Sequence, residues 1–219
     1  MAILVLAAVV AAAQPRAFSI PSGSNIPTLL VGDVIMAGRF SYGVSAGSLG
    51  FPAGLFKGRL LASDPQQGDI AFFLFPHDPS VIYVKRVIGM PGDRVQMKEG
   101  RLYLNGTMVP RQEDGTYALK DMFGRKQDVP KYIETLPNGV KYDIIEIQGD
   151  VGFYDNTQEF LVPPGQYFTM GDNRDNSEDS RDMTASGVGF VPADNFIAKA
   201  WAVLYSTSSE PGRTFKPIQ

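Results

Sequence analysis

SVIYVKRVIGM, residues 80–90, is the stretch that decides the fold. Its β-branched and aromatic residues are typical of a β-strand. Alternate side chains of a strand face opposite ways, so Lys85 shares a face with Tyr83 and Val87, while Arg86 lies on the other face with Ile88. Both faces are otherwise apolar. The stretch therefore predicts a strand in which each of two neighbouring cations interrupts a hydrophobic surface.

The same strand-like composition recurs beyond Pro15, between turns rich in Gly, Pro, Asn and Asp. Asn105-Gly106 is the strongest tight-hairpin signal in the chain. The sequence contains no evident long amphipathic helix and no repeat. We expect a mainly β protein built of antiparallel sheets, with further strands in LLVGDVIM, GDIAFFLF, RVQM, RLYLNGTMV, KYDIIEIQ, QYFTM and NFIAKAWAVLYS.

Length and composition indicate one large domain, or one domain that carries an insertion. The chain has 219 residues, of which 44% are hydrophobic, and this is enough for a sizeable core. Residues 111–158 are more polar and are expected to form an inserted smaller β subdomain, whereas 15–110 and 159–219 form the main β core. The Gly-rich residues 41–65 predict a long, exposed hairpin.

Charge and residue usage exclude several classes of function. The formal net charge is −3 and there is no long basic run, so nucleic acid is not expected as a partner. The chain has no cysteine, which excludes disulfides, thiolate catalysis and cysteine metal sites. A single histidine, His77, cannot form a multi-histidine metal site.

The apolar run Ala2–Ala13 is 12 residues long, shorter than the roughly 20 that span a bilayer as a helix. It fits the hydrophobic region of a cleavable signal peptide, a buried core helix, or the end of a longer membrane anchor. Taken alone, the run favours a signal peptide, although no positive charge precedes it.

The available nucleophiles are the hydroxyls of serine and threonine and the amine of lysine. PSGSNIPTLLVGD, residues 21–33, places Ser22 and Ser24 one residue apart between prolines. A serine needs a base, and His77, between prolines in FPHDPS, is more typical of a surface turn. Burial among apolar groups would lower the pKa of Lys85 and let it act as a base, which Arg86 cannot do. Taken alone, however, Lys85 favours an ordinary strand-edge lysine whose amine reaches water.

The third polar stretch is GDNRDNSEDSR, residues 171–181. Its spacing does not match a calcium-binding loop, and a network of Asx turns explains it better. The functional alternative is a rigid brace in which Asp179 and Arg181 form an ion pair while Ser177 presents its hydroxyl to an amine.

Together these stretches resemble a known family. SGSNIPTLLVGD, GDIAFFLFP, IYVKRVIGMPGD and GDNRDNSEDSR followed by GVGFVP are similar to the ordered motifs of bacterial type I signal peptidases, which are serine endopeptidases with a Ser/Lys dyad. The resemblance extends from Phe18 to Tyr205 and is weak between residues 111 and 158. It implies a signal-peptidase-type catalytic core.

The resemblance implies a role for each matching residue. Ser24 would be the nucleophile and neutral Lys85 its general base. The Ser24 backbone N–H and the Ser22 hydroxyl would form the oxyanion hole, and no metal or organic cofactor would be required. Support of the base would come from Ser177, Asp179 and Arg181, and the substrate pocket would be lined by Phe18, Ile20 and Val84.

The family further implies preproteins with small residues, of the Ala-x-Ala type, before the cleavage site. It implies a monomer in the bacterial inner membrane, in contact with lipid and with the catalytic domain on the periplasmic face. Exposed apolar side chains within residues 41–65 would contact lipid. Ten residues separate Ala2–Ala13 from Ser24 and span at most about 36 Å. Given the motifs, residues 1–14 are therefore expected to be the end of an uncleaved anchor.

One position departs from the family pattern. Asn25 follows the expected nucleophile where the family usually has methionine. This substitution supports a rival hypothesis, a specialised enzyme for one dedicated substrate. A second rival is a membrane-tethered β module that has lost activity, against which Ser24 and Lys85 argue.

Overall fold

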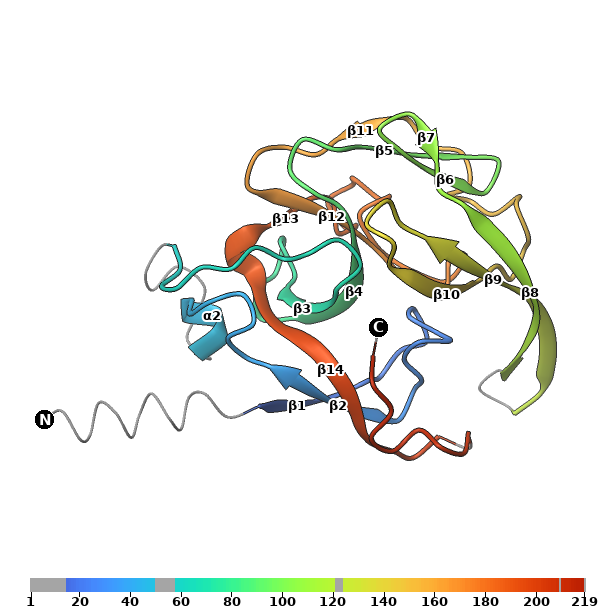
Figure 1. Cartoon of the computed structure of the whole chain (residues 1–219), viewed down its shortest axis with the longest axis horizontal. Coiled ribbons are helices and arrows are strands. Elements are labelled where there is room, and N and C mark those ends of the chain that lie inside the picture. Colours follow the sequence, from blue (N-terminus) through green and yellow to red (C-terminus); the bar gives the residue numbers. More distant parts are fainter. Residues whose placement is uncertain (1–14, 50–57, 121–123, 209, 219) are drawn as a thin grey trace, which may run out of the picture.

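A computed structural model of the chain describes residues 15–49, 58–120, 124–208 and 210–218, and it is almost entirely β (Figure 1). Within these residues the helical elements are α2 (Ala46–Leu49) and the 3-10 turn η1 (Ala193–Asn195). The strands are β1 (Arg16–Ser19), β2 (Asp33–Gly38), β3 (Ile70–Leu74), β4 (Ile82–Gly89), β5 (Arg94–Lys98), β6 (Arg101–Leu104), β7 (Thr107–Met108), β8 (Arg111–Lys120), β9 (Lys126–Thr135), β10 (Lys141–Ile145), β11 (Phe160–Leu161), β12 (Gln166–Met170), β13 (Val191–Pro192) and β14 (Phe196–Ser206). The predicted mainly β architecture is confirmed.

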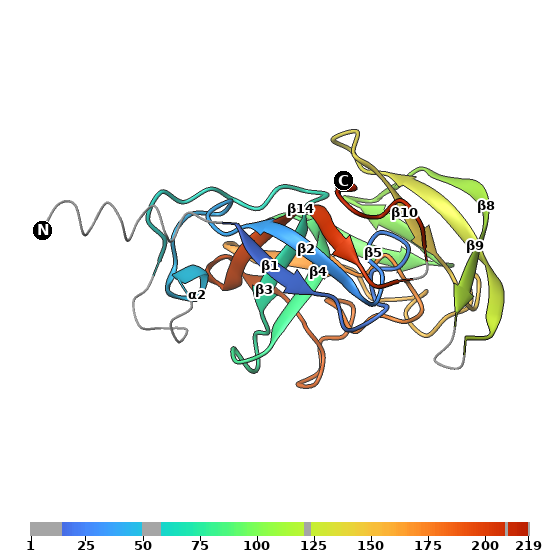
Figure 2. The ribbon, with the colours of Figure 1, turned by 90° about the horizontal axis from the view of Figure 1, so that it is seen from below.

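The strands form three sheets whose strand pairs are antiparallel. The largest has seven strands in the order β1-β2-β14-β3-β4-β12-β13, a second has the order β10-β9-β8, and a third has the order β11-β5-β6-β7. The long strand β14 runs through the middle of the view, and the β8–β9 ribbon extends at the end of the molecule away from β1 (Figures 1 and 2).

Several predicted strands match the observed ones closely. β3, β4, β12 and β14 lie inside the expected stretches, and Asn105 and Gly106 both have positive φ, of 52° and 79°, in the tight turn between β6 and β7. In LLVGDVIM, β2 begins only at Asp33, and the residues before it form a turn.

The sequence did not predict β1 or the β8–β9 ribbon. Most residues of β8 are exposed on both faces, so β8 lacks the alternation of apolar and polar residues that marks a half-buried strand. β8 is held to β9 by backbone hydrogen bonds over almost its whole length. Backbone pairing leaves no hydrophobic pattern in the sequence, so this strand could not be recognised from such a pattern.

The Gly-rich residues 41–65 differ from the exposed hairpin that was predicted. An antiparallel bridge joins Val44 to Leu60, but α2 lies between them, and residues 50–57 are outside the described part of the chain. Tyr42 is buried, and its hydroxyl donates to the Asp69 carboxylate at 3.0 Å. The described start of the segment therefore packs into the protein.

The apolar run Ala2–Ala13, expected to end a membrane anchor, lies outside the described residues. Within the described ranges, no helix is long and apolar enough to cross a bilayer.

β4 separates two parts of the hydrophobic core. Val87 belongs to a cluster with Phe73 and Phe196, and Ile88 belongs to a cluster built with the two smaller sheets. Lys85 and Arg86 are both buried, which matches a strand that is covered on both faces. A third cluster fills the space around β2, β3 and β14.

Arg86 is neutralised in the interior by Asp172. Its Nε and Nη2 atoms donate to the two carboxylate oxygens of Asp172, each at 2.8 Å, and both side chains are at most 1% exposed. Nη1 donates to the Gly68 carbonyl at 2.7 Å, and the guanidinium lies 4.2 Å from the centre of the Tyr142 ring. The ion pair fixes residues 171–181 against β4.

We expect Asp172→Asn to lower the free energy of unfolding by about 3–5 kcal/mol, because it keeps the side-chain shape but leaves the buried Arg86 charge uncompensated. Denaturant unfolding measures the effect. The control is Glu159→Gln in the exposed Arg94–Glu159 pair, which should cost about 0–1 kcal/mol. Equal losses in the two variants would contradict this assignment.

Candidate active site

The loop that carries Ser24 connects β1 to β2 and is closed at its base by backbone hydrogen bonds between Ile20 and Asp33 and between Gly32 and Ile20. The far side of the loop is fastened to residues 171–181. The Asn173 backbone N–H donates to the Ser24 carbonyl at 3.0 Å, and the Asn173 amide donates to the Gly23 carbonyl at 3.0 Å. The Ser24 backbone is therefore held from two sides.

Ser24 and Lys85 meet in this structure. The Lys85 Nζ atom lies 2.7 Å from the Ser24 Oγ atom, although the two residues are 61 positions apart in the chain. Ser24 is 8% exposed and Lys85 is 4% exposed. The interpretation of Lys85 as a strand-edge lysine with a solvated amine is therefore wrong.

Burial lowers the pKa of Lys85 to about 8. The negative charges of Asp179 and Glu178 act in the opposite direction, and the positive charge of Arg181 adds to the lowering. A lysine with this pKa is partly neutral near pH 7–8, and only the neutral amine can accept a proton. The geometry therefore pairs a hydroxyl with an amine able to act as its base.

Ser22 is exposed beside this pair. Its Oγ atom lies 3.5 Å from Ser24 Oγ, at the outer limit of a hydrogen bond. The structure thus brings both hydroxyls of the predicted site to the same point of the loop.

Residues 171–181 form a polar brace in which Asp179 and Arg181 are buried. Arg181 donates to both oxygens of Asp179 at 2.9 Å, and its guanidinium also donates to the Arg174 carbonyl at 2.6 Å. Asp179 in turn accepts a bond from the Gly171 backbone N–H at 3.0 Å. Burial opposes ionisation of Asp179, but the charge and hydrogen bonds of Arg181 outweigh it and lower its pKa. The ion pair expected from the sequence is present.

Ser177 lies in the same cleft as Ser24 and Lys85 and is 7% exposed. Its Oγ atom has no hydrogen-bond partner among the described residues, so the expected bond to the Lys85 amine is not formed here. The Cα of Gly171 packs directly against it, because a Cβ at position 171 would lie 2.3 Å from Ser177 Oγ and 2.4 Å from the Ser24 carbonyl oxygen. Only glycine fits at this point of closest approach.

Asn25 occupies the position that departs from the family pattern. It is 1% exposed, and its Nδ2 atom donates to the Val84 carbonyl at 2.7 Å. The amide therefore ties the loop that carries Ser24 to the residue preceding Lys85. The sequence marked Asn25 as unusual but did not indicate this contact.

An open cleft of about 590 Å³ contains the pair. Val84 lines it, but the other two residues predicted for the substrate pocket lie elsewhere. Ile20 is buried in the core cluster around β2, β3 and β14, and the Phe18 ring stacks on Phe72 at 4.1 Å. The rest of the lining is mixed: Val81, Ile82 and Tyr83 continue the apolar wall beside Val84, and Tyr154, Asp175, Asn176 and Glu178 add polar groups.

His77 takes no part in this site. It is exposed, its ring lies 5.5 Å from that of Phe75, and it is not among the residues lining the cleft.

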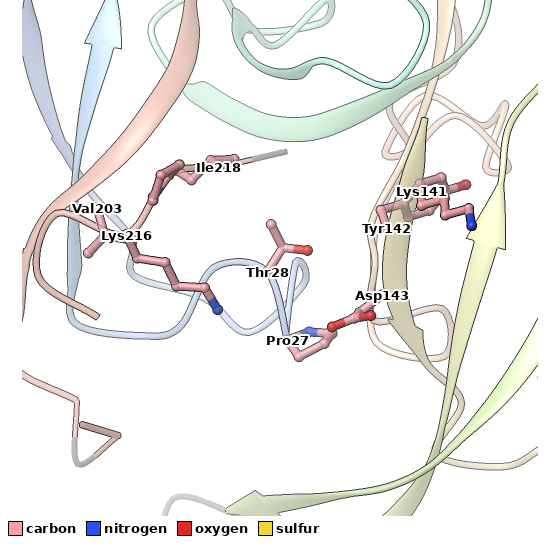
Figure 3. A pocket seen from close by; sticks show the side chains of 9 residues that line it. Pro27, Thr28, Lys141, Tyr142, Asp143, Val203, Lys216 and Ile218 are labelled. Atoms are coloured by element: carbon pink, nitrogen blue, oxygen red, sulfur yellow. The ribbon is translucent and has the colours of Figure 1, made fainter. Parts of the chain in front are cut away.

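A second cavity, of about 330 Å³, lies on the other side of the nucleophile loop. Figure 3 shows Thr28 and Pro27 between Lys141 on β10 and Lys216 on the C-terminal segment. The two hydroxyls in its lining, of Thr28 and Tyr142, donate to the carboxylates of Asp172 and Glu134, and neither lies beside a lysine amine in the way that Ser24 does.

Comparison with known proteins agrees with this geometry. The family model described as "Signal peptidase, peptidase S26" matches residues 1–205. Signal peptidase I of Rickettsia canadensis (strain McKiel) is 45% identical over 199 residues, which cover 87% of this chain and 71% of that protein. Signal peptidase I of Rickettsia prowazekii (strain Madrid E) is 45% identical over 197 residues, covering 87% and 72%.

A crystal structure of a signal peptidase I from Enterococcus faecalis V583 is 27% identical, with 63% of this chain and 97% of that chain covered, at a TM-score of 0.36. Family membership rests on the sequence matches rather than on this superposition.

Fold, site and sequence matches define a serine peptidase, a hydrolase. The chain belongs to the signal peptidase family, peptidase S26, whose members remove signal peptides and are associated with membranes in bacteria. The hypothesis of an inactive β module is not supported.

Gly171→Ala should lower the melting temperature more than Gly106→Ala does. The methyl group at position 171 would collide with Ser177 and with the Ser24 backbone, whereas position 106 has open space and only its positive φ penalises alanine, by about 1–2 kcal/mol. Thermal unfolding of both variants is the measurement. A Gly171→Ala protein as stable as the control would show that the two loops are not in close contact.

Proposed function

We propose that this chain is a membrane-bound endopeptidase that removes signal peptides from exported preproteins by a Ser24–Lys85 dyad mechanism. The observation that carries the proposal is the 2.7 Å approach of Lys85 Nζ to Ser24 Oγ, in a buried setting that lowers the pKa of the amine to about 8.

In the first step neutral Lys85 accepts the Ser24 proton as the Ser24 Oγ atom attacks the carbonyl carbon of the scissile peptide bond. The negative charge that develops on the carbonyl oxygen is stabilised by the Ser24 backbone N–H and the Ser22 hydroxyl. One such donor is worth about 2.7–4 kcal/mol in the transition state. The position of Ser22 Oγ, 3.5 Å from Ser24 Oγ, supports this role.

In the second step protonated Lys85 gives its proton to the leaving amine, and the signal peptide remains as an ester on Ser24. Lys85 then takes a proton from a water molecule that attacks this acyl-enzyme, and the proton returns to Ser24 Oγ as the acid is released. The same amine thus serves as base and acid in both halves of the reaction.

The neighbouring loop positions the base in this proposal. Ser177 would turn its unbonded hydroxyl toward the Lys85 amine during the reaction, and Asp179 with Arg181 would hold the segment in place. The supporting observation is that all three side chains are buried beside the dyad.

The preferred substrates would be preproteins with small residues of the Ala-x-Ala type before the cleavage site, bound along the cleft beside Val84. We place the enzyme, as a monomer, in the inner membrane with its catalytic domain on the periplasmic face. Lipid contact through residues 41–65 is supported by Leu60 and Leu61, which are 69% and 90% exposed.

Replacing either member of the dyad should abolish cleavage. We expect Ser24→Ala to lower kcat on a preprotein by on the order of 10⁴-fold or more, and Lys85→Arg to do the same because it keeps the charge but removes the base. The assay is preprotein cleavage in detergent, with far-UV circular dichroism to establish folding. The matched control His77→Ala should retain full activity, and a large loss there would favour a histidine base.

The pH dependence of kcat/KM should report the Lys85 amine. The enzyme is active when Lys85 is neutral, so the rate should rise by about ten-fold per pH unit below the pKa and level off above pH of about 8. Because the Glu178 charge raises the pKa of Lys85, Glu178→Gln should move this limb to lower pH. A limb that does not move in Glu178→Gln, or a midpoint below pH 6, would argue against Lys85 as the base.

A further inference from the structure

A group of three carboxylates lies beside the active-site loop but outside the mechanism. Glu146 follows β10, Asp155 lies at the end of the next loop, and Asp175 belongs to residues 171–181. One oxygen atom from each lies within 4.8 Å of those of the other two. Like charges at this separation repel one another unless something neutralises them.

Glu146 has the least ordinary environment of the three. It is 0% exposed, and neither of its carboxylate oxygens accepts a hydrogen bond from the described residues. The Asp155 Oδ1 atom is also buried and without a hydrogen bond. Buried carboxylate oxygens are normally hydrogen-bonded or bound to a metal, so these oxygens need a partner.

The arginines around the cluster do not supply that partner. The approach of Arg111 to Glu146 is 3.7 Å, too long for a hydrogen bond, and Arg111 donates to both oxygens of Asp150 at 2.8 Å. The nearby guanidiniums donate to other carboxylates, in the pairs Arg111–Asp150, Arg174–Glu134 and Arg181–Asp179, and the buried Arg174 Nε and Arg181 Nη1 atoms have no hydrogen-bond partner among the described residues. No hydrogen bond therefore joins an arginine of the described residues to any of the three clustered carboxylates.

The two aspartates are held so that their remaining oxygens stay available. The Gly152 backbone N–H donates to Asp155 Oδ2 at 2.5 Å, and the Gln148 backbone N–H donates to Asp175 Oδ2 at 2.6 Å. Such bonds to the second oxygen orient carboxylate ligands in metal sites. Gly152 also leaves room for Asp175, because a Cβ there would lie 1.9 Å from Asp175 Oδ1.

We infer that Glu146, Asp155 and Asp175 bind a divalent cation, Ca²⁺ in preference to Mg²⁺. Three carboxylates offer only oxygen ligands, which suit these two ions rather than zinc or copper. Ca²⁺ bonds of 2.3–2.6 Å can join oxygens up to roughly 5 Å apart, whereas Mg²⁺ bonds of about 2.1 Å would require the cluster to contract. Water and backbone carbonyls would complete the shell.

The ion would join two loops that both line the active-site cleft. Tyr154, next to Asp155, and Asp175 are among the lining residues, and Asp175 is two positions from Ser177. A bound Ca²⁺ would therefore fasten residues 146–155 to the segment that braces Lys85. Its role is structural, since the cation does not take part in the Ser24–Lys85 chemistry.

The test is calcium binding by the full chain in detergent, after removal of metals with EDTA, by isothermal titration calorimetry with CaCl₂. We expect one site per chain with a dissociation constant on the order of 10⁻⁴–10⁻³ M, weaker binding of MgCl₂, and a melting temperature that rises with CaCl₂ concentration. Using the Ser24→Ala protein as well separates calcium binding from catalysis.

Glu146→Gln and Asp175→Asn keep the shape of each side chain and should each weaken calcium binding by roughly ten-fold or more. Asp175 is partly exposed, so this variant should fold even if a change at Glu146 does not. The matched control is Glu178→Gln, an exposed carboxylate on the same segment, which should bind calcium as the wild type does. The inference is overturned if the wild type shows no saturable binding at about 10 mM CaCl₂, or if both variants bind like the control.

Discussion

Arg86 and Asp172 meet in the interior, where a guanidinium and a carboxylate are stable only as a fully hydrogen-bonded pair. The pair joins β4 to residues 171–181, and Asp172 also accepts a bond from the Thr28 hydroxyl at 2.5 Å, so the nucleophile loop is tied to the same carboxylate. These three segments carry Lys85, Ser177 and Ser24. Because the buried Arg86 charge is neutralised by Asp172, these three segments cannot separate without breaking a buried ion pair.

Two neighbouring cations on β4 meet opposite conditions because a strand turns successive side chains to opposite faces. Arg86 meets a carboxylate at 2.8 Å and keeps its charge. Lys85 is buried near Asp179 and Glu178, but its closest polar contact is the neutral Ser24 hydroxyl, so desolvation prevails and lowers its pKa. The order of the two residues matters, because arginine in place of Lys85 would stay protonated in the same environment.

Much of the core fold could be predicted from local sequence. β3, β4, β12 and the Asn105-Gly106 turn follow from β-branched runs and turn residues, since in these elements local preference and burial agree. The β8–β9 ribbon could not be predicted in this way, because β8 is exposed on both faces and the ribbon is specified by backbone pairing.

The site was only partly predictable for a similar reason. The residue types and motifs pointed to Ser24 and Lys85, but Lys85 alone favoured a solvated amine, because its burial depends on the loop that covers it. Phe18 and Ile20 were expected to line the cleft, but Ile20 is buried in the core cluster around β2, β3 and β14 and the partly buried Phe18 packs against that cluster, because local sequence does not indicate which surface of β1 and the following loop faces Ser24 and Lys85. The Asn25–Val84 contact joins segments 59 residues apart in the chain, and local sequence patterns do not predict contacts over such a separation.

Residues 171–181 take part in two kinds of electrostatic contact, an ion pair and a group of three carboxylates. On one side, Asp179 pairs with Arg181 and accepts a hydrogen bond from the Gly171 backbone N–H, so its charge is neutralised within the segment. On the other side, Asp175 approaches Glu146 and Asp155, and no cation among the described residues is hydrogen-bonded to these three carboxylates, since Arg111 stays 3.7 Å from Glu146. Repulsion there would push residues 146–155 away from the segment and widen the cleft at Tyr154. Whatever neutralises these carboxylates therefore acts on the part of the cleft lined by Tyr154 and Asp175, whereas Asp179 and Arg181 neutralise each other without an added ion.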